Sequence, residues 1–176
     1  MRIVYKIAIQ IYFLLVMFAS IFNPKALRWL RGRRHLWKRL KEGIDKSKEL
    51  YWFHCSSLGE FEQGRPLIEE FRRRKPEAFI LLTFFSPSGF EMRKNYQGAD
   101  LVSYLPLDTG LNAWRFINLV KPKAVYFIKY EFWYYFLRTL YKKKVPVYLV
   151  SAKFRKDQTF FKWYGAWYLK FLRFFT

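Results

Sequence analysis

The sequence predicts an α/β fold in which a Rossmann-like parallel sheet carries helices on both faces. Apolar, β-rich runs recur along the chain, and helical patterns fill the intervals; the runs begin at Tyr51, Ala78, Leu101, Ala124 and Val145. These starts lie 27, 23, 23 and 21 residues apart, the size of repeated strand-and-helix units. The runs AFILL and AVYFI are apolar throughout, as strands covered on both faces must be.

Composition restricts the class of partner. The chain has 176 residues, 52% of them hydrophobic, which is enough for one domain with a core. A net charge of +20 indicates an acidic partner, such as nucleic acid, an anionic membrane or a phosphorylated substrate. Aromatic residues reach 23%, which suits a membrane interface or stacking on single-stranded nucleic acid. The single cysteine, Cys55, excludes an internal disulfide, and we interpret it as a packed thiol. The two histidines form no cluster with it, so we predict no metal site.

Residues 1–23 are predicted to form a membrane-anchor helix. The run Ile7–Phe22 is interrupted only by Gln10 and Ser20. As a helix it would be about 24 Å long, slightly short of a bilayer core, so the anchor either spans the membrane or lies in its interface. No small-residue cleavage site follows, which makes a removable signal peptide the weaker interpretation.

Residues 24–49 are predicted to form a basic juxtamembrane helix. The stretch Lys25–Lys48 carries ten lysines and arginines against two acidic residues. By the positive-inside tendency, we expect this stretch and the domain after it to lie on the cytoplasmic side of the membrane, where anionic headgroups would attract them. The alternative is a solvated basic helix without a specific ligand.

Residues 50–176 form the predicted Rossmann-like domain. A helix begins near Glu60 and ends at Pro76, and a second is capped by Ser86 with a proline in its first turn. We expect Asp108 to cap a third helix and Glu131 to open a fourth. The inward residues of the third are predicted to be Leu111, Trp114, Ile117 and Val120, and those of the fourth Phe132, Trp133, Phe136, Leu137 and Leu140. Asp157–Phe175 is predicted to be a helix that is apolar on all sides, for which we expect a partner surface in a second domain or a membrane.

The loops after the strands carry the candidate functional residues, because ligands of open α/β sheets bind at the carboxyl ends of the strands. Hydroxyls, glycines and charged side chains gather there and suit sugar hydroxyls and phosphates; they are Ser56, Ser57, Gly59, Glu60, Ser86, Ser88, Gly89, Asp108, Lys129 and Glu131. Glu60 and Glu131 are the strongest pair for acid–base chemistry or charge stabilisation. In the alternative interpretation Gly59 only makes a turn and the carboxylates only stabilise helix starts. The chain has neither a dinucleotide-binding nor a P-loop glycine motif, and no Asp-x-Asp pair for a metal-dependent sugar-nucleotide site.

Five motifs in one order give the whole chain a specific resemblance. They are WFHCSSLGEFEQGRPLI (52–68), TFFSPSGFE (83–91), YLPLD (104–108), YEFW (130–133) and SAKFRKDQTFFKWYG (151–165). With the apolar N-terminal run, the chain resembles the N-terminal half of the 3-deoxy-D-manno-octulosonic acid (Kdo) transferases of lipopolysaccharide synthesis. Members of that family look like two-domain glycosyltransferases of the GT-B type. Their N-terminal domain receives lipid A precursor and their C-terminal domain holds CMP-Kdo.

The resemblance implies roles for individual residues. Glu60 matches the catalytic base of the S-x-G-E motif, which takes the proton of the acceptor hydroxyl as it attacks Kdo with inversion and release of CMP. Glu131 matches the second glutamate of the family's E-x-E-L-W-type motif, credited with transition-state support, while Lys129 replaces the first. Lys153 stands where many members have arginine. Ser57, Gly59, Ser86, Ser88, Gly89 and Lys129 are then the expected substrate-binding residues.

The sequence therefore predicts the acceptor-binding domain of a membrane-associated Kdo transferase that needs no cofactor. Its expected partners are lipid A precursor, an anionic membrane surface and a C-terminal nucleotide-sugar domain that is absent from this chain. Two alternatives remain open at this point. One is a non-catalytic, membrane-tethered scaffold that binds lipid A, and the other is a basic nucleic-acid-binding module.

Overall fold

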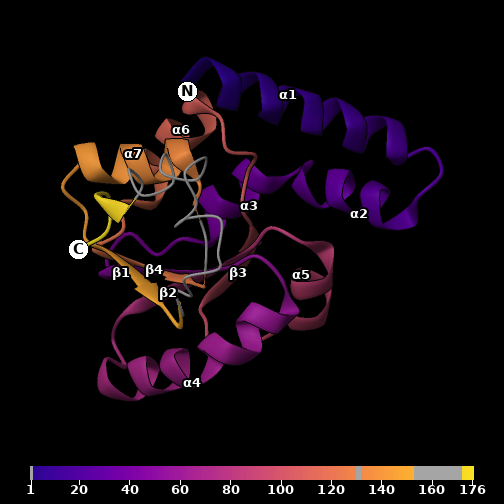
Figure 1. The fold of residues 1–176 in the computed structure, drawn as a ribbon. Coiled ribbons are helices and arrows are strands. Elements are labelled where there is room, and N and C mark those ends of the chain that lie inside the picture. Colours follow the sequence, from indigo (N-terminus) through magenta and orange to yellow (C-terminus); the bar gives the residue numbers. More distant parts are fainter. Residues whose placement is uncertain (1, 130–131, 153–171) are drawn as a thin grey trace.

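The computed structural model describes residues 2–129, 132–152 and 172–176, and it shows one parallel sheet with helices packed around it (Figure 1). The strands follow the order β3-β2-β1-β4-β5, and every neighbouring pair is parallel. In chain order the elements are α1 (Arg2–Ala19), α2 (Pro24–Arg33), α3 (Leu36–Gly43), β1 (Leu50–Cys55), α4 (Leu58–Arg74), β2 (Phe79–Phe84), α5 (Pro87–Arg93), β3 (Leu101–Tyr104), α6 (Gly110–Val120), β4 (Ala124–Ile128), α7 (Tyr134–Lys142) and β5 (Val147–Val150). The predicted α/β class and the parallel sheet are confirmed.

Each predicted apolar run is a strand, and each strand starts within two residues of its expected position. β1 and β2 are buried along their whole length because β1 lies between β2 and β4 and helices cover the sheet. Pro146 stands just before β5, where its missing N–H removes no bond from the ladder.

Alternate side chains of β1 build the two layers of the core. Trp52 points to one face, where its ring lies 4.9 Å from Phe116 of α6 and 5.8 Å from Phe136 of α7, measured between ring centroids. Phe53 points to the other face, 5.3 Å from Phe71 of α4. This alternation places α6 and α7 on one face of the sheet and α4 on the other (Figure 1).

The predicted helix from Glu60 is α4, with Phe61 and Ile68 buried. Ser86 caps α5 as expected, since its hydroxyl accepts a bond from the Ser88 N–H. α7 begins at Tyr134 and not at Glu131 as predicted, so Phe132 and Trp133 precede the helix instead of forming its inward face. Phe136, Leu137 and Leu140 are buried as predicted.

The third helix corrects the prediction in two ways. Thr109, not Asp108, caps α6, because the Thr109 hydroxyl accepts the Asn112 N–H at 3.2 Å. Leu111 and Trp114 are 71% and 58% exposed instead of inward. The buried face of α6 is made by Ala113, Phe116, Ile117 and Val120, a stripe shifted around the helix from the expected one.

The N-terminal residues form three helices. α1 and α2 lie side by side (Figure 1), and residues 24–49 hold two helices, α2 and α3, where one was expected. Within the part of the chain that the structure describes, no single helix is both long and apolar enough to cross a membrane. Ile3–Ala19 and Pro24–Arg33 meet that criterion only as a pair, and they are bent by 118°.

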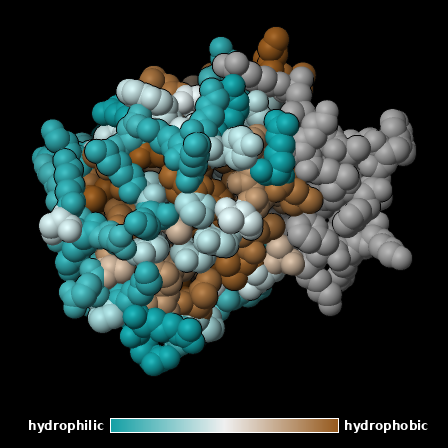
Figure 2. Space-filling view, turned by 90° about the vertical axis from the view of Figure 1, so that its left-hand side faces the viewer, coloured by the Kyte–Doolittle hydropathy of each residue, from teal (hydrophilic) through white to brown (hydrophobic). Residues whose placement is uncertain are grey.

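The expected helix over Asp157–Phe175 falls almost wholly on residues 153–171, outside the described residues. After them, the Thr176 N–H donates to the Val147 carbonyl at 2.8 Å, so the last described residues lie along β5. Figure 2 turns to the side on which α7 and β5 lie and shows many hydrophilic residues with hydrophobic ones exposed between them.

Candidate functional site

The strand order creates a topological switch point between β1 and β4. The chain moves outward from β1 through β2 to β3, and then returns to the other side of β1 to form β4 and β5. The loops that follow β1 and β4 therefore diverge at the carboxyl edge of the sheet, where open α/β sheets hold their ligands. Glu60 follows β1, and the segment 129–133 follows β4. In chain order, the two predicted catalytic carboxylates therefore follow the two strands that flank the switch point.

Glu60 lies half-buried in the first turn of α4. The hydroxyl of Ser57, the residue that precedes the helix, donates to the Glu60 carboxylate and accepts no capping bond from an N–H of α4. This bond fixes the position of the carboxylate beside the short turn between β1 and α4. A general base needs a fixed position of this kind to come within hydrogen-bond distance of a bound hydroxyl. Gly59 is exposed beside it, and of the residues that the structure describes a Cβ at that position would meet only Ser57, at 3.9 Å from its hydroxyl.

The β2–α5 loop lies next to the β1–α4 loop. The Ser86 N–H donates to the Ser56 carbonyl at 2.7 Å, which joins the two turns directly. The Ser86 and Ser88 hydroxyls lie 2.9 Å apart near the surface. Gly89 is buried instead, and a Cβ there would lie 2.3 Å from the Phe84 ring. The structure therefore gives Gly89 a packing role that explains the glycine without a ligand.

Lys129 directly follows β4 and has a φ of 65°, in the left-handed region that a non-glycine residue seldom adopts. Its N–H donates to the Val150 carbonyl at 2.7 Å, so the backbone is held to β5 at this point. Left-handed residues at loops of this kind often belong to functional sites. Glu131, the second predicted catalytic residue, lies outside the described residues.

Sequence reasoning missed Arg33, which hydrogen-bonds to two of the loops that follow the strands. Its guanidinium, on α2, donates to the Phe85 carbonyl at 2.7 Å and to the Leu105 carbonyl at 3.0 Å. These carbonyls belong to the loops after β2 and β3. The guanidinium carbon lies 3.8 Å from the centre of the Trp29 ring, a cation–π contact. Burial lowers the pKa of Arg33 to about 9, but this pKa is still above neutral pH, so the side chain stays cationic. The signal in the sequence was the pair Trp29 and Arg33, four residues apart on one helix face.

Asp108 is fully buried and also serves a distant element. Its carboxylate accepts the Tyr135 N–H at 3.1 Å and the Phe136 N–H at 3.0 Å, at the start of α7, and the Tyr5 hydroxyl of α1 at 2.5 Å. Burial raises the pKa of Asp108 to about 6, against the lowering effect of these three bonds. Burial, with the nearby Asp108 charge second, raises the pKa of Tyr5 as well.

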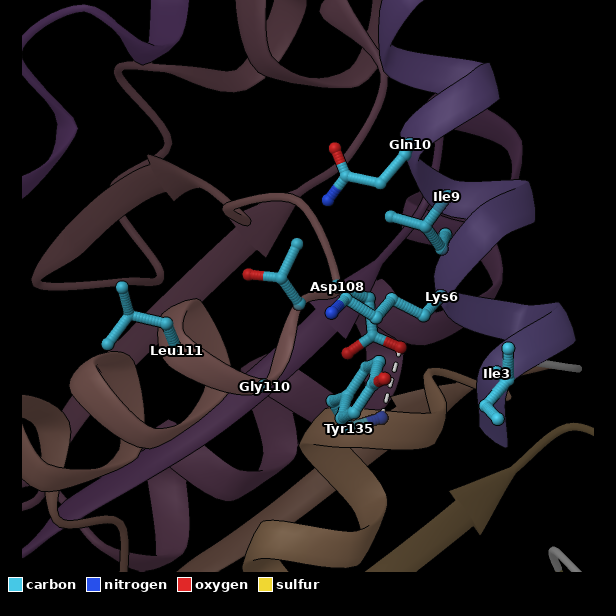
Figure 3. Close-up of a pocket in the computed structure, with 9 residues that line it drawn as sticks. Ile3, Lys6, Ile9, Gln10, Asp108, Gly110, Leu111 and Tyr135 are labelled. Atoms are coloured by element: carbon cyan, nitrogen blue, oxygen red, sulfur yellow. Dashed lines mark hydrogen bonds between the residues drawn. The ribbon is translucent and has the colours of Figure 1, made fainter. Parts of the chain in front are cut away.

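A cavity of about 960 Å³ opens beside this junction, between α1 and the start of α6 (Figure 3). Lys6 and Gln10 reach from α1 toward the loop after β3, and Asp108 lies next to Tyr135 at its inner end (Figure 3). Glu60 does not line this cavity. Among the described residues, no group of three or more histidine, cysteine or acidic side chains could hold a metal ion.

The comparisons with known proteins give the family. The family described as "3-Deoxy-D-manno-octulosonic-acid transferase (kdotransferase)" matches residues 30–176. A "3-deoxy-D-manno-octulosonic acid transferase" of Aquifex aeolicus is 38% identical over 113 residues, 64% of this chain and 30% of that protein. The transferase of Haemophilus influenzae is 31% identical over 103 residues, 58% of this chain and 24% of that protein.

A third relative, "Probable 3-deoxy-D-manno-octulosonic acid transferase, mitochondrial" of Arabidopsis thaliana, is 30% identical over 145 residues, 78% of this chain and 32% of that protein. The chain thus spans about a third or less of the length of these relatives. The family match covers far more than half of the chain. The chain therefore belongs to the 3-deoxy-D-manno-octulosonic acid transferase family of glycosyltransferases.

Proposed function

We propose that this chain is the acceptor-binding domain of an enzyme that transfers Kdo from CMP-Kdo to lipid A precursor in lipopolysaccharide biosynthesis. The observation that carries the proposal is the position of Glu60 beside the switch point, on a short turn held by Ser57. The relatives are named as transferases of 3-deoxy-D-manno-octulosonic acid, which supports Kdo as the sugar that is transferred. The donor CMP-Kdo would be held mainly by a second, nucleotide-sugar-binding domain that closes over this edge of the sheet. No cofactor or metal is needed for the step below.

In the proposed reaction Glu60 is the general base. A hydroxyl oxygen of the acceptor sugar attacks the anomeric carbon of Kdo, and the Glu60 carboxylate takes the hydroxyl proton. The bond from the anomeric carbon to the phosphate oxygen breaks, and CMP leaves with its electron pair. Attack opposite the leaving group inverts the configuration at the anomeric carbon. Lys129, which follows β4, would offset negative charge on the departing CMP phosphate. For Glu131 the family resemblance suggests transition-state support.

The test is Kdo transfer by this chain joined to the C-terminal half of a relative. We expect Glu60→Gln to lower kcat by about 10²–10⁴-fold, the usual contribution of a general base. The matched control is Glu69→Gln on the same helix, whose exposed carboxylate pairs only with Arg65, at 3.7 Å, among the described residues. A near-normal rate in Glu60→Gln, with active wild type, would remove Glu60 as the base and favour a non-catalytic scaffold at this site.

We place the protein at the inner membrane, with this domain on the cytoplasmic face. The support is the outer side of α1, where Leu14, Phe18 and Val4 are 58%, 66% and 69% exposed. The inner side of α1 packs on the domain through Tyr5 and Tyr12. A helix that is held along one side and apolar along the other suits the membrane interface, and the basic residues of α2 and α3 suit anionic headgroups.

Vesicle binding tests this placement. The chain should sediment with vesicles that contain an anionic phospholipid and much less with neutral ones, and added salt should weaken binding. Phe18→Glu should reduce binding to both kinds of vesicle, whereas Met92→Glu on α5, equally exposed at 65%, should not. Equal binding by the Phe18 variant and wild type would contradict the role given to α1.

A further inference from the structure

The start of α7 has no capping side chain of its own. Trp133 occupies the capping position and makes no side-chain cap. Phe136, Leu137 and Leu140 of this helix are buried in the core, so water cannot easily satisfy the first N–H groups. Asp108 supplies the missing acceptor from 27 residues away, with one carboxylate oxygen for the Tyr135 N–H and the other for the Phe136 N–H.

The same carboxylate is tied to α1. The Tyr5 hydroxyl donates to Asp108 at 2.5 Å across 103 residues of chain. The Tyr5 ring also packs on this junction, with centroids 5.5 Å from Tyr134 and 5.8 Å from Tyr135. Tyr5 therefore contacts both the capping residue Asp108 and the first turn of α7, and these contacts hold α1 to the start of α7. Figure 3 shows the bond between Asp108 and Tyr135.

The start of α7 is in contact with the other loops of the candidate site. Trp133, the residue before the helix, lies 4.6 Å from Phe85 in the β2–α5 loop and 6.0 Å from His54 near the end of β1, between ring centroids. Because Trp133 directly precedes α7, a shift of the helix start would move the Trp133 ring relative to Phe85 and His54.

We propose that Asp108, tied to α1 by Tyr5, is the positioning residue of the β4 side of the candidate site. It fixes the start of α7 and so sets where Trp133 packs against Phe85 of the β2–α5 loop and His54 of β1. The N-terminal helix is then a working part of the site as well as a surface element. The inference rests on the proposed function for its catalytic readout, but its structural readout is independent of it.

The structural test is amide hydrogen exchange on the 176-residue chain. In Asp108→Asn an amide N–H₂ must face either the two donors on Oδ2 or the donor on Oδ1, so the cap is lost in part. We expect the Tyr135 and Phe136 amides to exchange about tenfold faster, with the strands unchanged. Tyr5→Phe should give a smaller acceleration at the same amides, because both backbone bonds to Asp108 remain. Tyr12→Phe, on the same helix, is the matched control and should change neither amide.

The catalytic test uses the same variants joined to the C-terminal half of a relative. A misplaced start of α7 should lower kcat more than it raises KM, by about 10–100-fold for Asp108→Asn and less for Tyr5→Phe. If Asp108→Asn fails to fold, Tyr5→Phe decides the question. Unchanged exchange at Tyr135 and Phe136 in Tyr5→Phe, or an unchanged kcat in a folded Asp108→Asn, would overturn the proposal. Faster exchange with a wild type that transfers no Kdo would support the positioning role and count against the proposed reaction alone.

Discussion

Gly59 offers a prediction in which stability and activity should change in opposite directions. No described glycine has a positive φ, so the backbone at Gly59 does not require glycine. Within the described part of the chain, a Cβ there would make one ordinary contact, with the Ser57 hydroxyl at 3.9 Å. The fold therefore leaves this glycine unexplained, although it lies next to the carboxylate proposed as the base.

The magnitude follows from these contacts. Replacing glycine by alanine at a compatible position stabilises a protein by about 0.4–1 kcal/mol, largely by restricting the unfolded chain. In a domain of this size the gain should raise Tm by about 1–4 °C. The added methyl group would occupy the open space beside Glu60. Because a base must come within about 3 Å of the hydroxyl, and a 1 Å misplacement can cost about 10²-fold, we expect Gly59→Ala to lower kcat by about 10–100-fold.

Thermal unfolding and Kdo transfer are measured on the same preparation. Two glycines on neighbouring elements are the controls, because a Cβ would lie 2.8 Å from Ile128 at Gly64 and 2.3 Å from Phe84 at Gly89. Alanine at either should lower Tm. A lower Tm in Gly59→Ala would show that the geometric argument is wrong. A higher Tm with unchanged transfer would show that the space beside Glu60 is not used by substrate.

Two further predictions concern buried charge. Arg33→Lys keeps the positive charge, but a lysine ammonium cannot reach both the Phe85 and the Leu105 carbonyls. The free energy of unfolding should therefore fall by about 1.5–3 kcal/mol, the contribution of one charge-assisted hydrogen bond. Urea unfolding measures this against Arg31→Lys, an exposed arginine on the same helix, and equal midpoints would contradict the bracing role. The pKa of Asp108 is raised from its ordinary 3.8 to about 6, so the native state binds more protons between these values. Its contribution to stability is full below about pH 4 and is lost as the pH rises through about 6, a loss of about 3 kcal/mol. Urea unfolding from pH 4 to 7 should show this decline in wild type relative to Asp108→Asn, and parallel profiles would contradict it.

The sheet could be predicted from the sequence because each strand is a local feature. A strand that is buried on both faces is a short run of consecutive apolar residues, and a run such as AFILL can be recognised without knowing which strands lie beside it. The turn with Ser57 and Glu60 is local in the same way, since three residues separate the two side chains that meet. The excess of charge and aromatic residues was less informative, because it suits a membrane and a nucleic acid equally.

The errors fall where distant parts of the chain decide the outcome. Asp108 is a good helix cap by sequence, but Thr109 is equally able to cap α6, and the buried start of α7 has no other acceptor. Leu111 and Trp114 lie on a helical stripe with Ile117, yet Phe116 fits against Trp52 and rotates the buried face away from them. Arg33 looked like one more charge in a basic stretch. Only the approach of α2 to the loops after β2 and β3 shows its use.

The attachment of α1 and α2 has a consequence for how the enzyme would work on a surface. Tyr5 attaches α1 to the domain near the first turn of the helix, and Arg33 attaches α2 near its last turn. The two helices therefore cannot rotate freely relative to the sheet. A bilayer that receives the outer side of α1 would then fix the tilt of the whole sheet. Glu60 would stand at a set height above the lipid, and the acceptor headgroup would be presented to it at one angle.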